Sequence, residues 1–100
     1  MTIEKKRVLR IRKNEKGAPS EVVVETYFTI TVNLGDIAIQ FNDHYRHPSI
    51  DASELGGKIK SLKSALEHAE GSIASFYEEF ERALKRAREE LNIEEIKVEG

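Results

Sequence analysis

The chain has 100 residues, 39% of them hydrophobic, and a formal net charge of -2. A chain of this length suits one compact domain and leaves no residues for a second core. The near balance of 16 basic and 18 acidic residues gives no overall attraction to nucleic acid or to an anionic membrane. The lack of cysteine excludes a disulfide framework, a thiolate metal site and a cysteine nucleophile.

The first residues do not resemble a targeting segment. They begin with a charged run, Glu4, Lys5, Lys6 and Arg7, and contain no apolar stretch of the length that a signal peptide or a membrane span needs. We therefore expect a cytoplasmic protein that does not contact a membrane. No motif indicates a bound cofactor, and we expect none.

Residues 1–42 are expected to form a three-stranded antiparallel sheet. Residues 7–13 alternate apolar with basic side chains, which is the period of a half-buried strand, and residues 14–20 contain the Gly and Pro of a hairpin loop. Residues 21–33 form the clearest strand, because one of its faces carries Val22, Val24, Thr26, Phe28, Ile30 and Val32. A tight turn at residues 33–36, in which Gly35 can take a positive φ, leads to a third strand with Ile37, Ile39 and Phe41.

The apolar pattern also predicts the pairing register. If Ile11 lies opposite Val22 and Val32 lies opposite Ile37, all apolar side chains point to one side of the sheet. The other side is then a polar surface with Tyr27 near its middle. The predicted class is therefore α+β, a meander whose apolar face is covered by the helical region that follows.

Residues 43–50 are expected to form a loop, and residues 51–92 a helical region. Asp51 and Glu54 have the spacing of a capping box. Apolar residues then recur every three or four positions, at Leu55, Ile59, Leu62, Leu66, Ala69, Ile73, Phe76, Phe80, Leu84, Ala87 and Leu91. This spacing predicts an amphipathic stripe along the whole region.

The sequence leaves two arrangements of this region open. A break near Gly71 gives a helical hairpin, since Gly71 suits the position after a helix end. An unbroken helix keeps the phase of the stripe, but it exceeds the length that the expected sheet can cover and so implies a coiled-coil dimer. We favour the hairpin. Residues 93–100 are expected to form a short edge strand, based on the alternation of Ile96 and Val98, or a tail.

The predicted loop is the first candidate site. Its residues Asp43, His44, Tyr45, Arg46 and His47 include two of the three histidines of the chain. His44 and His47 with Asp43 or Asp51 could bind a metal, and a histidine with Asp43 as its orienting group could serve a small hydrolase. The spacing lacks a zincin helix and no nucleophile motif accompanies it, so packing of these side chains over the sheet edge is the favoured interpretation.

The basic N-terminal strand is the second candidate site. Residues 1–17 contain seven basic and two acidic residues. Lys6, Arg10 and Arg12 with the outward-facing Tyr27 could bind nucleic acid through phosphate contacts and base stacking. A solvated edge strand protected by its charges explains the same pattern and is favoured.

The function that these observations favour is a small non-enzymatic interaction module. It would bind another macromolecule, with a protein partner favoured over nucleic acid, and would associate as a homodimer. The alternatives are a nucleic-acid-binding domain that uses the basic strand and the outer sheet face, and a small hydrolase or metal site at residues 43–47.

Overall fold

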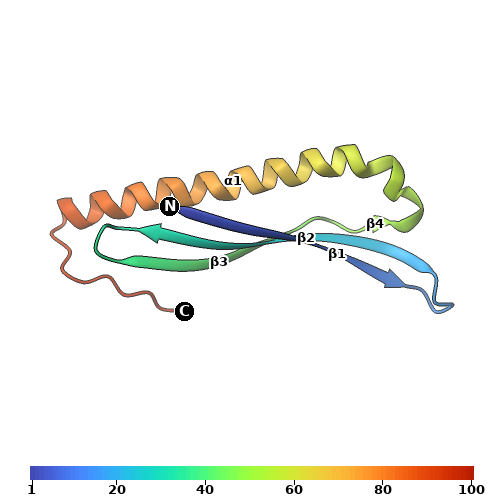
Figure 1. The fold of residues 1–100 in the computed structure, drawn as a ribbon, viewed down its shortest axis with the longest axis horizontal. Helices are drawn as coiled ribbons and strands as arrows, with labels where there is room; N and C mark the ends of the chain where they lie inside the picture. The colour runs from blue at the N-terminus through green and yellow to red at the C-terminus, as the bar shows by residue number, and fades with distance from the viewer.

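The computed structural model describes residues 1–100 as an antiparallel sheet with one long helix lying along one of its faces (Figure 1). The elements in chain order are β1 (Thr2–Lys13), β2 (Pro19–Asn33), β3 (Ala38–Arg46), β4 (Ile50–Asp51), the 3-10 turn η1 (Ala52–Glu54) and α1 (Leu55–Glu90). The molecule measures 61 × 25 × 16 Å. The predicted α+β class, a meander followed by a helical region, is confirmed.

The strands lie in the order β1-β2-β3, and the short β4 pairs with β2 beyond the end of β3. The predicted pairing of Ile11 with Val22 is confirmed. Val32 pairs with Ile39 and not with Ile37, because residues 34–37 form a longer turn than expected, with Gly35 at a φ of 93°. A shift of two residues keeps each side chain on its predicted face, so the core face is unchanged.

The prediction of a loop over residues 43–50 is wrong for its first half, since β3 continues to Arg46. The alternation between the two faces continues through this segment: Thr26, in the core row of β2, is opposite Tyr45, and Tyr27 is opposite His44. Odd-numbered residues of β3 therefore face α1 and even-numbered residues face outward.

The helix is continuous over 36 residues, from Leu55 to Glu90, so the favoured hairpin is wrong and the unbroken alternative is correct. The sheet covers most of its length, because the 15 residues of β2 span about 50 Å and the helix spans about 54 Å. Packing along this length outweighs the weak helix propensity of Gly71. The apolar stripe of α1 is covered by the sheet of the same chain, so the continuous helix does not require a coiled-coil dimer.

Two apolar clusters join the helix to the sheet. One consists of the buried residues Phe28, Ile30, Val32, Leu34 and Tyr77, and the other of Val24, Ile50, Leu62 and Leu66. Each cluster lies under a different half of α1, and both depend on the core row of β2. No helix of the structure combines the length and the apolar content that crossing a membrane requires.

The ends of the helical region also differ from expectation. Asp51 caps η1 and not α1, since its Oδ1 accepts a hydrogen bond of 2.9 Å from the backbone N–H of Ser53. Residues 93–100 form no strand, so the expected edge strand is wrong and the tail alternative holds. Ile96 packs against the first apolar cluster, and Figure 1 shows the tail running back on the side of β3.

Gly71 offers a direct test of the continuous helix. A Cβ atom placed on Gly71 meets no atom within 4 Å. Gly71→Ala should therefore raise the free energy of unfolding by about 1 kcal/mol, the difference in helix propensity between the two residues. Chemical denaturation followed by circular dichroism measures this change. A destabilising effect would show that the chain breaks at Gly71 in solution.

Candidate functional site

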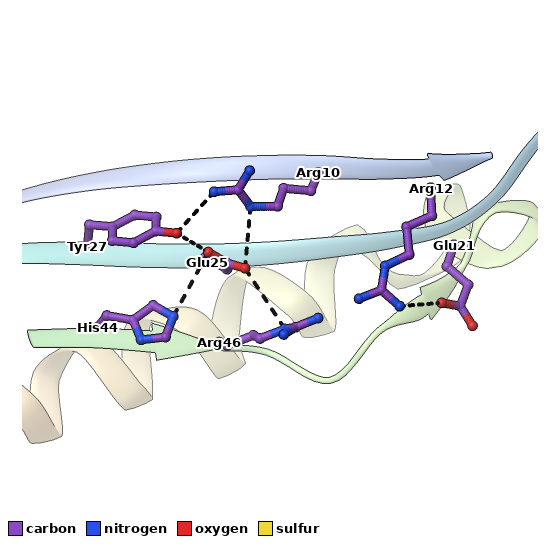
Figure 2. Close-up of polar contacts among 7 residues, drawn as sticks. All are labelled: Arg10, Arg12, Glu21, Glu25, Tyr27, His44 and Arg46. Atoms are coloured by element: carbon purple, nitrogen blue, oxygen red, sulfur yellow. Dashed lines mark hydrogen bonds and ion pairs between the residues drawn. The ribbon is translucent and has the colours of Figure 1, made fainter.

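The uncovered outer face of the sheet brings together residues of both predicted candidate sites (Figure 2). The predicted basic face supplies Lys6, Arg10 and Arg12 from β1 and Tyr27 from β2, and the predicted loop supplies His44 and Arg46 from β3. We call Arg10, Glu25, Tyr27, His44 and Arg46 the outer cluster. Its members come from three adjacent strands, so the sheet itself positions them.

Glu25 lies at the centre of the outer cluster and is only 6% exposed, although no helix covers this face. Its carboxylate Oε1 lies 3.4 Å from Arg10 Nε and 3.9 Å from Arg46 Nε. Its Oε2 lies 3.9 Å from His44 Nε2. Figure 2 shows these side chains reaching toward Glu25 from the two flanking strands. One carboxylate therefore holds two guanidinium groups and an imidazole on an open surface.

Tyr27 completes the cluster. Its hydroxyl donates a hydrogen bond to Glu25 and accepts one of 3.1 Å from Arg10 Nη2. Its ring stacks on the His44 ring, with centroids 5.2 Å apart and an interplanar angle of 25°. The Tyr27 hydrogen bond, assisted by the charge of Arg10, lowers the pKa of Glu25 against the opposing effect of burial. Glu25 therefore stays ionised and keeps its partners ordered.

The outer face as a whole is close to charge balance. Arg12 Nη1 lies 3.3 Å from Glu21 Oε2, while Lys6, opposite Tyr27, takes part in no ion pair. The cations on this face are Lys6, Arg10, Arg12 and Arg46, and the carboxylates are Glu4, Glu21, Glu25 and Asp51, which lies opposite Glu21 in β4. The carboxylates therefore offset the basic charge that β1 brings to this face.

The remaining residues of the predicted loop lie on the helix side. Asp43 Oδ2 accepts a hydrogen bond of 3.0 Å from the hydroxyl of Tyr77. The Tyr45 hydroxyl lies 3.2 Å from His47 Nδ1. The sheet thus separates His44 from His47, the two histidines that the metal hypothesis needed together. No group of three or more His, Asp or Glu side chains is placed to hold a metal ion.

A second charged cluster, which the sequence analysis missed, lies between β1 and α1. Glu70 is 3% exposed, and its carboxylate accepts hydrogen bonds from Arg7 at 2.8 and 2.6 Å, from Lys5 at 3.0 Å and from the Thr26 hydroxyl at 2.8 Å. The Arg7 hydrogen bonds, with those of Lys5 and Thr26, lower the pKa of Glu70 to about 2 against the effect of burial.

The cluster of Glu70, Arg7, Lys5 and Thr26, here called the inner cluster, joins the edge strand β1 to α1. Its carboxylate already accepts four hydrogen bonds, which leaves no free position for a ligand. A signal for it was present in the sequence, because Lys5, Arg7 and Thr26 occupy positions that face the core in the predicted register. Charged residues at such positions need a buried partner, and Glu70 lies on the apolar stripe one turn after Leu66.

No protein-family model matches the chain, and comparisons with curated proteins and with solved structures find no significant match. The outer face of the sheet offers a preorganised set of arginine, tyrosine and histidine side chains, which can donate hydrogen bonds and stack against a partner.

Proposed function

We propose that this protein is a non-enzymatic binding module whose outer sheet face docks a protein partner around the outer cluster. The observation that carries the proposal is the ordering of Arg10, Tyr27 and Arg46 around one shielded carboxylate on an otherwise open face. Arginine and tyrosine are the residues most enriched at the centres of protein interfaces. Side chains that are ordered before binding lose less conformational entropy when a partner docks.

The charges of the outer face support a protein partner over a polyanion. Binding to nucleic acid depends on cations that are free to neutralise phosphates. Here Arg10 and Arg46 already lie beside Glu25, and Arg12 lies beside Glu21. Only Lys6 remains without a carboxylate partner on this face. A surface with both signs of charge and a central aromatic ring is better suited to a partner that also carries both signs.

A pull-down from an extract of the source organism tests this proposal. The baits are the wild-type chain, the variant Arg10→Glu/Arg46→Glu, and the control Arg86→Glu, whose arginine is 77% exposed on α1, away from the sheet. We expect the wild type and the control to capture the same protein, and the outer-face variant to capture at least about tenfold less of it. A central arginine contributes more than about 1.4 kcal/mol to binding, which corresponds to a factor of ten.

Two results would contradict the proposal. Equal recovery of every captured protein by all three baits would exclude the outer face as the docking surface. Retention of the wild type on oligonucleotides that weakens steeply as salt increases would favour nucleic acid as the ligand of this face. Circular dichroism of the variants shows that the comparison is made between folded chains.

A further inference from the structure

The free edge of β1 is the longest unpaired backbone in the sheet. β1 has 12 residues and pairs only with β2, so the N–H and C=O groups of its other side have no strand partner. All of its residues except Ile3 and Val8 are exposed. It carries six cations and a single carboxylate, Glu4. Pairing of this edge with β1 of another copy would bring like charges together and is disfavoured.

The C-terminal tail has the opposite chemistry. Ile96 and Val98 alternate with Glu95, Lys97 and Glu99, as in a strand with one apolar side. Residues 94–100 make no backbone hydrogen bond within the chain. The side chain of Ile96 lies against the first apolar cluster, whereas Val98 is 57% exposed. The tail is thus extended, predominantly acidic and without a backbone partner.

We propose that residues 94–99 of a second copy of this chain add to the free edge of β1 as an antiparallel strand, with Ile96 opposite Leu9. This mode of recognition combines main-chain hydrogen bonds with alternate side-chain contacts. The register places Glu95 opposite Arg10, Glu99 opposite Lys6 and Lys97 opposite the uncharged Val8. Ile96 leaves its own core and covers Leu9, which is 49% exposed in the single chain.

This register requires a second copy, because the chain's own tail cannot reach it. The C-terminal half of α1 lies at the start of β1, where Glu81 Oε2 is 3.4 Å from the N-terminal amine of Met1. Glu94 would have to lie opposite Ile11, about 30 Å farther along β1. Glu94 lies three positions after Leu91, and a segment of that length spans at most about 10 Å. The association is therefore between chains.

Cysteine trapping tests the register, and the cysteine-free chain makes the result simple to interpret. The single variants Val8→Cys and Lys97→Cys, the first carrying a tag of different mass, are mixed and oxidised. Directly opposed residues in an antiparallel pair have Cα atoms within the range that a disulfide spans. We expect a mixed disulfide between residues 8 and 97, identified by mass spectrometry. Light scattering of the full wild-type chain should give a mass above that of one chain.

Matched variants distinguish disulfides that form in the proposed strand pairing from disulfides that form by random collision. Gln40→Cys, on the outer face of β3, replaces Val8→Cys as the control and should give at least about tenfold less mixed disulfide with Lys97→Cys. In the trapping pair, Lys6→Glu should reduce the yield, and adding Glu99→Lys to the other chain should restore it. A monomeric chain at concentrations up to about 1 mM, or equal yields with residues 8 and 40, would overturn the proposal.

Discussion

Replacing Glu70 with glutamine is expected to lower the free energy of unfolding by about 2–3 kcal/mol at pH 7. The amide removes the charge that three donors share and leaves Arg7 and Lys5 facing a neutral group. Glu67→Gln is the matched control, because Glu67 lies one turn earlier, is exposed and takes part in no ion pair. Urea denaturation of both variants measures the difference, and the control should stay within about 0.5 kcal/mol of the wild type.

The pH dependence of the stability loss in Glu70→Gln shows whether the charge of Glu70 causes it. The pKa of Glu70 falls from an ordinary value of 4.5 to about 2 in the folded chain. A lowered carboxyl pKa stabilises the folded state above the unfolded pKa, and this stabilisation is lost as the pH falls through the folded pKa. The difference in free energy of unfolding between the wild type and Glu70→Gln should therefore decrease as the pH falls from 4.5 to 2. A gap that stays constant over this range would show that Glu70 acts through packing and not through its charge.

Leu66→Ala is expected to destabilise the chain by about 2–5 kcal/mol, the range for deleting a buried leucine side chain. Leu66 is 4% exposed and packs with Val24 and Ile50 under the first half of α1. Chemical denaturation measures the loss, and retained helical circular dichroism shows that the variant still folds.

Ile59→Ala provides the comparison for Leu66→Ala. Ile59 belongs to the same predicted stripe but is 59% exposed and belongs to neither apolar cluster. We expect its replacement to change the free energy of unfolding by less than about 1 kcal/mol. Equal losses for the two variants would mean that the helix is rotated or displaced on the sheet relative to this structure.

The sequence was sufficient to predict the sheet because its core row is strictly alternating. The row from Val22 to Val32 has one face that can be buried, and Ile11 joins that face only in registers of the observed parity. The same limit applies to β3. Ile37 and Ile39 have the same parity, so the apolar pattern cannot separate pairings that differ by two residues.

The rest of the fold depended on contacts that local patterns do not contain. Asp43 interrupts the apolar pattern of β3. It nevertheless faces the helix, because its carboxylate accepts a hydrogen bond from the hydroxyl of Tyr77. Gly71 is typical of a helix end, but the packing of α1 along the long sheet outweighs the low helix propensity of glycine. The outer cluster was predicted only in part: Arg10, Tyr27, His44 and Arg46 were candidate site residues, whereas Glu25, which lies at the centre of the cluster, was not.

The thinness of the molecule has a consequence for its energetics. The shortest dimension is 16 Å, and only 14 of the 100 residues are buried. A single layer of side chains between helix and sheet supplies nearly all of the apolar stabilisation, so the margin of folding free energy is narrow. Any ligand that prefers the folded chain shifts the unfolding equilibrium in proportion to the logarithm of its concentration. Binding of the proposed partner would therefore slow both unfolding and proteolysis of this protein.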